Sequence, residues 1–425
     1  MKGSKTPALK DGNYVAEWFG HRVWPEVDTS EAARINQSAR ACPFLTTVTG
    51  EATECVKRTK KPGWSEPYGV CTISSTANGK RQDWINCPHR TLDQHFTLLS
   101  AAVHSLYRIP DTEDIVLLPV TVLNQPEQRN RIRAGLDSGR LIFVFSAIKL
   151  GGEVSLPETA ASPAAAVDVS IVQVLEAELD GRPTKYGQHL FYEIQTADFH
   201  GSPLIAAAAL RDLCPKGDPV SGFHDRLVGK KAVAGNAVEG PNKSNIFKRT
   251  IYQMILKIAL SEHAASTGFA IVIPVAVWDS WFKHLGGPTL HPLGKDGKHF
   301  ALKAPKETLK GIRAKSRAAI LVFEIDHAAT ERPQPLTLLK HIWCTSEALT
   351  YFAFQQAAEK AISEKVISRF RASLEERIKQ GVNGTLQKEN VTKRAKRATA
   401  RPQGEQVLLE FSAVTETASG DVHPE

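Results

Sequence analysis

The segment GQHLFYEIQTAD, residues 187–198, places a carboxylate and an amide two positions apart inside an apolar, strand-prone run. Because successive side chains of a strand point to opposite faces, Glu193 and Gln195 share one face, and Tyr192 and Ile194 share the other. A polar face of this kind is either the solvent side of a surface strand or a metal ligand beside a second polar group. Taken alone, the pattern favours the surface strand.

Two further carboxylates lie upstream of this segment. Asp168 lies in AAAVDVSIVQVLE, residues 164–176, which predicts a second strand, and LDGRP can form the turn between the two strands. Glu153 follows the pair Gly151 and Gly152. Hydrolysis of a phosphodiester needs a divalent ion that activates water and offsets charge on phosphate, and carboxylate oxygens suit Mg²⁺. The three carboxylates therefore indicate a candidate Mg²⁺ site.

Strand-like and helix-like patterns alternate around these two runs. The alternation predicts an α/β core in which helices flank a mixed sheet. Strands are predicted at 114–123, 139–148, 269–278 and 318–325, and helices at 91–109 and 240–268. A long helix is predicted at 349–380, with apolar side chains four residues apart at Ile362, Val366, Phe370, Leu374 and Ile378.

Four of the six cysteines lie close together in the first part of the chain, at Cys42, Cys55, Cys71 and Cys87. The surrounding segment, 14–95, is rich in Gly, Pro and Asn, which predicts loops and little regular core. A metal ion held by four thiolates would stabilise such a segment. The spacing lacks the C-x-x-C pattern, so four separate buried cysteines remain the alternative. Cys214 and Cys344 are predicted core residues.

The composition narrows the class of protein. A chain of 425 residues predicts two or more core units, and a net charge of +8 favours a polyanionic partner, with nucleic acid first. The sequence contains no run of about 18 apolar residues, and the N-terminal segment lacks an apolar stretch typical of a secretion signal. We therefore expect an intracellular protein without a membrane partner. The basic stretch KRAKRATAR after residue 385 predicts a flexible tail.

Several longer blocks resemble the NotI-type type II restriction endonucleases of the PD-(D/E)xK superfamily. The similarity extends from about residue 14 to 281 and continues more weakly through VFEIDHAATERPQPL, and residues beyond 349 match poorly. The blocks are VAEWFGHRVWPEV, EAARINQSARACPFLT, CVK, DWINCPHRTLD, KLGGE, YEIQTADFHGS, EGPNKSNIFKRTIYQM and TGFAI.

The resemblance implies a division into four parts. These are a four-cysteine metal-binding subdomain at 14–95, a PD-(D/E)xK nuclease core at 96–348, a C-terminal helix at 349–384 and a basic tail at 385–425. It also implies roles for the carboxylates. Asp168 and Glu193 would bind Mg²⁺, and Glu153 would bind a second ion or orient water. Gln195 stands where most of the superfamily has lysine, so no ammonium group would be available, and the amide would orient water.

Cys42, Cys55, Cys71 and Cys87 coincide with the four-cysteine site of the family, which holds iron. Tetrahedral thiolate sites accept zinc as well, so both metals are expected candidates. The candidates for DNA contact lie after the predicted strand that carries Glu193 and Gln195, and at the start of the helix predicted at 240–268. They are Asp198, His200, Asn242, Lys243, Asn245, Lys248 and Arg249.

The expected activity is site-specific, Mg²⁺-dependent cleavage of double-stranded DNA in the bacterial cytoplasm. A homodimer would match a GC-rich palindrome with a GGCC centre, such as GCGGCCGC, and a methyltransferase in the same host would protect its DNA. Two alternatives remain, a DNA-binding regulator stabilised by metal and a repair nuclease without sequence preference.

Overall fold

The computed structural model describes residues 11–77, 80–158, 160, 164–217, 223–229, 234–235, 238–362 and 364–383. One compact unit extends to Lys360, and a second begins at Ala361. Within the described residues, no helix has the length and apolar character needed to cross a membrane. The predicted tail after residue 385 lies outside the described residues.

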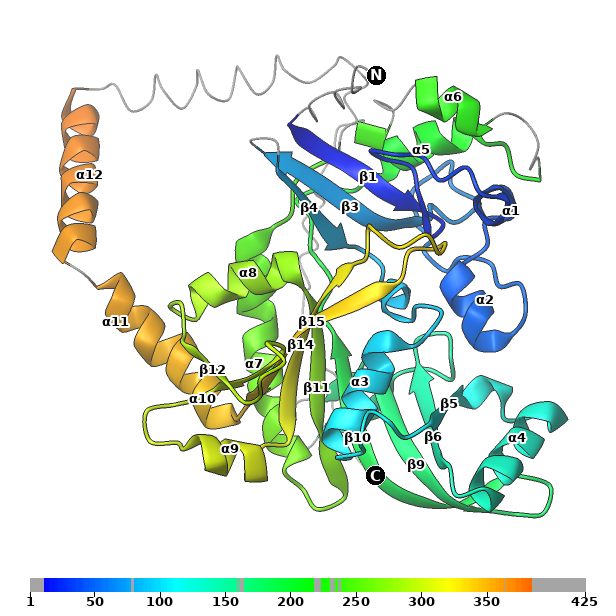
Figure 1. Cartoon of the computed structure of the whole chain (residues 1–425). Coiled ribbons are helices and arrows are strands. Elements are labelled where there is room, and N and C mark those ends of the chain that lie inside the picture. The colour runs from blue at the N-terminus through cyan, green and yellow to red at the C-terminus, as the bar shows by residue number, and fades with distance from the viewer. Residues whose placement is uncertain are drawn as a thin grey trace, which may run out of the picture. The chain divides into compact units, whose positions relative to one another are not determined.

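A mixed sheet of nine strands forms the centre of the first unit (Figure 1). Its strand order is β12-β13-β15-β14-β11-β10-β9-β6-β5. The three central strands, β10, β11 and β14, are parallel, and antiparallel strands β9 and β15 lie beside them. The nine strands are β5 (Ile115–Pro119), β6 (Leu141–Ala147), β9 (Val169–Ala177), β10 (Pro183–Ile194), β11 (Ser266–Pro274), β12 (Leu290–Pro292), β13 (His299–Leu302), β14 (Ala318–Ile325) and β15 (Leu336–Cys344).

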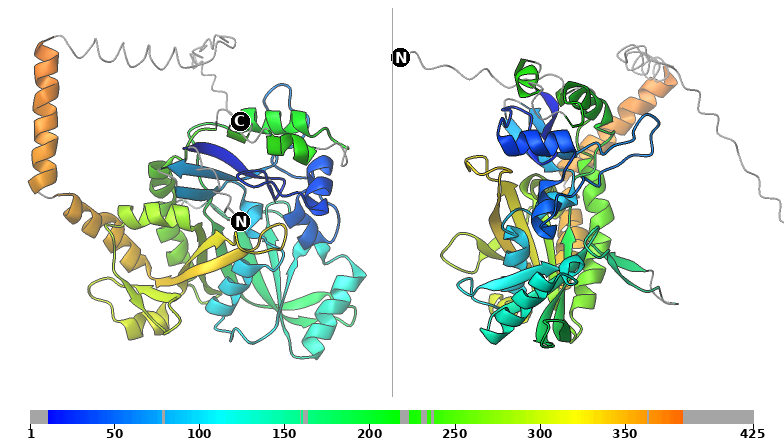
Figure 2. Two further views of the ribbon diagram at one scale, coloured as in Figure 1. Left: turned by 45° about the horizontal axis from the view of Figure 1, so that its top comes forward. Right: turned by 90° about the vertical axis from the view of Figure 1, so that its right-hand side faces the viewer.

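Helices cover both faces of this sheet, and strand β11 shows why. All nine of its residues are buried, as expected for a central parallel strand. Ala270 and Val272 belong to the core on the side of α3, whereas Phe269, Ile271 and Ile273 belong to the core on the side of α7 and α8. Figure 2 shows this layered arrangement from two further directions. The helices of the first unit are α1 (Glu31–Ala39), α2 (Pro43–Thr49), α3 (Thr97–Leu106), α4 (Pro126–Asp137), α5 (Leu204–Leu213), α6 (Phe223–Gly229), α7 (Lys243–Ser261), α8 (Val275–His284), α9 (Leu309–Lys315) and α10 (Ser346–Thr350), with 3₁₀ turns η1 (Pro88–Thr91) and η2 (Val120–Val122).

The predicted α/β class with a mixed sheet and flanking helices is confirmed, but several element boundaries were wrong. The predicted strand 269–278 ends at Pro274, where α8 begins. Val277, Trp278 and Trp281 have helical spacing and are buried against the sheet, so tertiary packing continues the apolar run as a helix. The predicted strand 114–123 likewise ends at Pro119 and continues as a 3₁₀ turn.

The first part of the chain contains more regular structure than its Gly and Pro content predicts. A second, antiparallel sheet has the order β2-β1-β3-β4, and its apolar side chains join the core of the molecule. Its strands are β1 (Gly12–Trp18), β2 (His21–Arg22), β3 (Val70–Ala77) and β4 (Lys80–Ile85). The expectation of a loop-rich segment with little core was wrong, because Val15, Trp18 and Ile73 bury an apolar face of this sheet.

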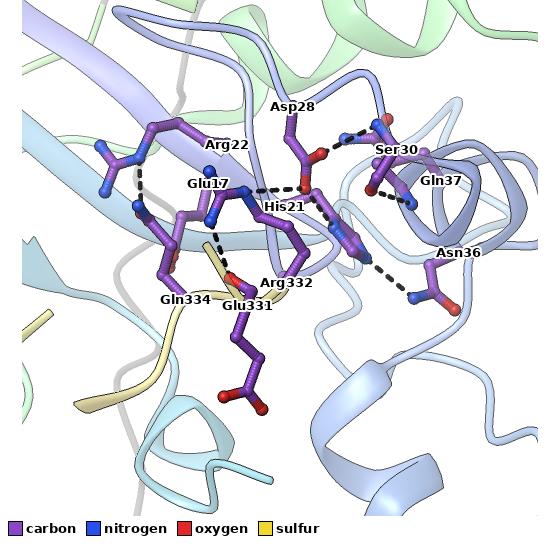
Figure 3. A network of polar contacts seen from close by, with 12 residues as sticks. Glu17, His21, Arg22, Asp28, Ser30, Asn36, Gln37, Glu331, Arg332 and Gln334 are labelled. Atoms are coloured by element: carbon purple, nitrogen blue, oxygen red, sulfur yellow. Dashed lines mark hydrogen bonds and ion pairs between the residues drawn. The ribbon is translucent and has the colours of Figure 1, made fainter. Parts of the chain in front are cut away.

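Buried polar side chains connect this small sheet to the segment between β14 and β15. Glu17 on β1 pairs with Arg90, and Arg90 also donates to the carbonyl oxygen of Gln334. Arg22 donates to the side chain of Gln334 (Figure 3). These residues come from three of the sequence blocks that carry the family resemblance, VAEWFGHRVWPEV, DWINCPHRTLD and VFEIDHAATERPQPL. The blocks therefore meet in one structural network that fixes the small sheet.

The predicted helix at 349–380 is interrupted. After α10, the chain forms a π-helix, η4 (Tyr351–Gln356), then α11 (Ala357–Ala361). The second unit contains α12 (Glu364–Val382). The predicted apolar stripe is present on α12, where Val366, Phe370, Leu374 and Ile378 are all exposed. These side chains are therefore not buried within the second unit.

Candidate functional site: a carboxylate pair facing a helix

The two carboxylates predicted to bind metal lie side by side. Asp168 lies between β8 (Ala165–Val167) and β9, one position beyond the pair of Val169 with Tyr192 on β10. This register places it opposite Glu193. The backbone N–H of Ile194 donates to Asp168 Oδ2 at 2.8 Å, and the backbone N–H of Asp168 donates to Glu193 Oε1 at 3.2 Å. These reciprocal bonds hold both carboxyl groups at the break between β8 and β9.

Burial makes both carboxyl groups weaker acids than they would be in water. The pKa of Glu193 is raised to about 7, first by burial and then by the neighbouring Asp168, although Lys257 opposes both effects. Burial also raises the pKa of Asp168. Two crowded carboxyl groups with raised pKa values indicate that this site lacks enough positive charge to keep both ionised.

A lysine supplies part of that charge, which corrects the expectation that no ammonium group is available here. Lys257 on α7 is 5% exposed, and its Nζ lies 2.6 Å from Glu193 Oε1. The hydrogen bonds and the ion pair described above all involve Glu193 Oε1 or Asp168 Oδ2. The other carboxylate oxygens, Glu193 Oε2 and Asp168 Oδ1, take no part in these three interactions.

Gln195 shares the carboxylate face, as its spacing predicts, but its amide is engaged. Thr250 on α7 donates to Gln195 Oε1 at 2.5 Å, and Gln195 Nε2 donates to the carbonyl oxygen of Thr196 at 2.7 Å. Gln195 therefore connects β10 to α7. The predicted role of Gln195 in orienting water is compatible with both bonds, because Nε2 carries a second N–H and Oε1 a second lone pair.

A cavity of about 200 Å³ opens onto these groups. One wall is the carboxylate face of β10, and the other is the face of α7 that carries side chains three or four residues apart. The backbone places α7 there, because Asn242 N donates to the carbonyl oxygen of Asp198 and His200 N donates to that of Gly240. The polar or charged lining residues are Asp168, Glu193, Gln195, Asp198, Arg249, Thr250, Gln253 and Lys257.

Glu153 is placed near the pair through its backbone but not through its side chain. Val154 on β7 (Val154–Leu156) pairs with Val167 on β8, so the next position of this register places Glu153 opposite Asp168. Glu153 is exposed and does not line the cavity. Gly151 allows this path with a φ of +99°, and a Cβ there would lie 2.1 Å from Val120 Cγ2.

The candidate DNA contacts lie around the mouth of this cavity and along the start of α7. Arg249 Nη1 pairs with Asp198 Oδ2 at 3.1 Å, so these two side chains neutralise each other in this structure. Asn245, Lys248 and His200 are exposed. Asn242 occupies the N-cap position of α7, but its side chain makes no capping hydrogen bond. The side chain of Lys243 lies outside the described residues.

The four cysteines of the first segment are buried thiols in the core beside the small sheet. Burial raises the pKa of Cys55 to about 12, and burial together with the other three cysteines raises the pKa of Cys71. Burial opposes ionisation of Cys87, but His89 and Lys57 lower its pKa. Cys214 and Cys344 are buried elsewhere, as predicted.

Backbone N–H groups point at these sulfur atoms. Gly20 N donates to Cys71 Sγ at 3.3 Å, and the N–H groups of Lys57 and His89 donate to Cys55 and Cys87. Hydrogen bonds of this kind favour a sulfur atom with negative charge. In the described part of the chain, however, no group of three or more His, Cys, Asp or Glu side chains has the arrangement needed to hold a metal ion.

Comparison with known proteins adds no relative: no protein-family model matches the chain, and no curated protein matches it either. The assignment of a function therefore depends on the geometry of this site.

Two residues of the site, Lys257 and Thr250, were missed by the sequence analysis. Both lie on the predicted helix at 240–268, and Lys257 falls between the apolar positions Met254 and Ile258. A lysine on the apolar face of an amphipathic helix is a signal that could have been used, because a buried ammonium needs a partner of opposite charge.

Proposed function

We propose that the protein is a type II restriction endonuclease that hydrolyses double-stranded DNA in the presence of Mg²⁺. The observation that carries the proposal is the reciprocal bonding of Asp168 and Glu193. It holds two partly buried carboxylates together at the end of a central strand of the mixed sheet, beside a cavity with polar walls. In this proposal the nine-stranded sheet contains a PD-(D/E)xK core, and the first segment is a four-cysteine subdomain.

The donor atoms of the pair suit the proposed ion. Asp168 Oδ1 and Glu193 Oε2 are hard oxygen ligands, and Mg²⁺ commonly takes one or two protein carboxylates and fills its other positions with water and phosphate. When bound, Mg²⁺ lowers the pKa of water and offsets the negative charge that grows on phosphate. Glu153 would approach this site only after a change in its side-chain position.

The four cysteines would hold iron or zinc as structural support. The N–H groups directed at sulfur favour thiolate ligands, and a bound cation would offset the rise in thiol pKa that burial causes. Closing the four sulfur atoms around one ion would require the surrounding loops to move. The ion would stabilise the region beside the active strand, because Ala197 N donates to the carbonyl oxygen of Ile85 on β4.

The proposed substrate is a GC-rich palindrome with a GGCC centre, such as GCGGCCGC, and the proposed assembly is a homodimer. Lys248 and Arg249 would contact phosphate, with Arg249 exchanging its bond to Asp198 for the DNA. The proposed setting is the bacterial cytoplasm, together with a methyltransferase that protects the host DNA.

The test uses plasmids that carry GCGGCCGC, CGGCCG or neither, incubated with the purified protein in Mg²⁺ or EDTA. We expect discrete fragments that require Mg²⁺ and are lost in Asp168→Ala. A smear from every plasmid would instead indicate a nuclease without sequence preference. Tight DNA binding without any cutting would indicate a metal-stabilised regulator and would remove the active-site assignment.

A further inference from the structure

We propose that Lys257 supplies the positive charge of the active site and contacts the phosphate or the attacking water, reaching the carboxylates from α7 instead of from β10. The inference rests on the proposed nuclease function. Lys257 lies on a helix, whereas Asp168, Glu193 and Gln195 were predicted from two strand-like runs of sequence.

The position of Lys257 is built into the fold. It lies two turns after Thr250 on α7, and both side chains line the same cavity wall as Gln253 and Met254. Thr250 bonds to Gln195, and Lys257 pairs with Glu193 at 2.6 Å. Because Glu193 and Gln195 share one face of β10, the two contacts fix the register between the helix and the active strand.

A purely structural role accounts poorly for an ammonium at this place. Met254 and Ile258, its neighbours on the same helix face, are 1% and 2% exposed, so an apolar side chain would suit the packing. Replacing buried ion pairs by well-packed apolar residues is often neutral or stabilising. The Lys257 ammonium lies at the wall of a polar cavity, next to one of two neighbouring carboxylates. This position favours a role for Lys257 in the reaction.

The ammonium also has donors to spare. It carries three N–H bonds, and Glu193 is its partner among the described residues. Two N–H bonds thus remain for oxygen atoms that enter the cavity. Gln195 cannot take this place, since an amide carries no net charge.

The reaction needs no further reactant. A water oxygen forms a bond to phosphorus, the bond between phosphorus and the leaving sugar oxygen breaks, and that oxygen takes up a proton. The water gives up one proton to solvent, so one diester and one water yield one phosphate monoester and one hydroxyl group. Lys257 would stabilise the negative charge that grows on the phosphate oxygens during this displacement.

The test compares single-turnover cleavage of a plasmid that the wild-type protein cuts, in Mg²⁺, with DNA binding measured in Ca²⁺. Lys257→Met should lower the cleavage rate by about 10²-fold or more, while DNA affinity changes less than about threefold. Lys257→Arg should retain more activity than Lys257→Met. The double variant Gln195→Lys/Lys257→Met returns an ammonium to the same carboxylate face and should recover at least about tenfold of the lost rate.

Lys185→Met is the matched control. Lys185 also pairs with a glutamate at 2.6 Å, Glu176, but both side chains are 61% exposed and lie at the other end of β10. This variant should cut at the wild-type rate. A merely structural Lys257 predicts a different result, in which thermal stability falls but the double variant recovers no activity.

The outcomes separate the two proposals. If wild-type protein cuts no DNA, the nuclease function fails and this inference fails with it. If wild-type protein cuts and Lys257→Met cuts equally fast, only the role of Lys257 is wrong. If Lys257→Met does not fold, the double variant decides, because it keeps a cation beside Glu193: recovered cutting supports the inference, and a folded but inactive double variant overturns it.

Discussion

Two glutamates, the buried Glu17 and the partly buried Glu193, each lie next to a cation, but their pKa values are shifted in opposite directions. Glu17 accepts bonds from Arg90 at 2.9 and 3.1 Å and from Thr72 at 2.5 Å. Burial opposes its ionisation, but Arg90 and its other partners outweigh this effect, so the pKa of Glu17 lies below its ordinary value. Glu193 pairs with Lys257 at 2.6 Å, yet its pKa is raised to about 7.

The difference between the two lies in charge balance and not in depth alone. Glu17 faces Arg90, with Arg22 also nearby, whereas Glu193 shares one lysine with a second carboxylate, Asp168. A satisfied pair is typical of structural support. A surplus of negative charge beside a cavity is typical of a site that awaits a cation. The comparison therefore separates a structural network from a candidate active site.

The largest effect is expected when the surplus charge is removed. Asp168→Asn should lower Mg²⁺-dependent cleavage by about 10²–10³-fold or more, since a carboxylate ligand is lost. The same change should leave stability equal or slightly higher, because Asn can still accept the Ile194 N–H bond and no longer raises the pKa of Glu193. Cleavage assays in Mg²⁺ measure the first quantity, and thermal melts in EDTA measure the second.

Asp180→Asn is the control for this change. Asp180 lies in the turn between β9 and β10, where its side chain is 43% exposed and pairs with arginines. Cleavage should be unaffected by this variant. Full activity of Asp168→Asn would mean that the carboxylate pair has been wrongly assigned.

Breaking the satisfied pair should have the next largest effect, on stability. Arg90→Met leaves Glu17 buried without its main partner and should lower the free energy of unfolding by about 3–5 kcal/mol. Arg371→Met, which removes a pair whose side chains are 80% and 58% exposed, should change it by less than about 1 kcal/mol. Chemical denaturation measures both. Equal losses would show that burial does not separate these pairs.

A pH titration should separate the two glutamates by sign. Because the pKa of Glu193 is raised, its protonated form favours folding at low pH, and this contribution is lost as pH rises from about 4.5 to 7. The shift corresponds to roughly 3 kcal/mol. Glu17, with its lowered pKa, contributes above its ordinary pKa and loses that contribution as pH falls.

Denaturation of the wild-type protein and of Asp168→Asn, both in EDTA between pH 5 and 8, measures this difference. The wild-type protein should lose more stability toward pH 8 than the variant, since the variant lacks the neighbouring charge. Identical pH dependence in the two proteins would contradict the charge surplus.

The sequence predicted the strand side of the site better than the side formed by α7. Alternation fixes which side chains share a strand face, so Glu193 and Gln195 could be placed together, and the antiparallel pairing of β9 with β10 follows from the short turn between them. Lys257 lies more than 60 positions beyond Glu193, and helical periodicity shows its face but not the strand that this face meets. For Glu153 the backbone lies near the pair, as predicted, but its exposed side chain does not line the cavity. A backbone position therefore does not determine the direction of a side chain.

The smallest effect is expected at Thr250, which tests whether the amide of Gln195 acts in chemistry or only in packing. Thr250→Val removes the hydroxyl whose single proton is shared between Gln195 Oε1, at 2.5 Å, and the carbonyl oxygen of Ile246. It should lower stability by about 1 kcal/mol and cleavage by less than about tenfold. Thr350→Val loses only a comparable bond to a carbonyl oxygen four residues earlier, so the difference between the two variants isolates the Gln195 contact. If Thr250→Val instead loses as much activity as Lys257→Met, then the position of Gln195 matters as much as the charge of Lys257, and the amide takes part in catalysis.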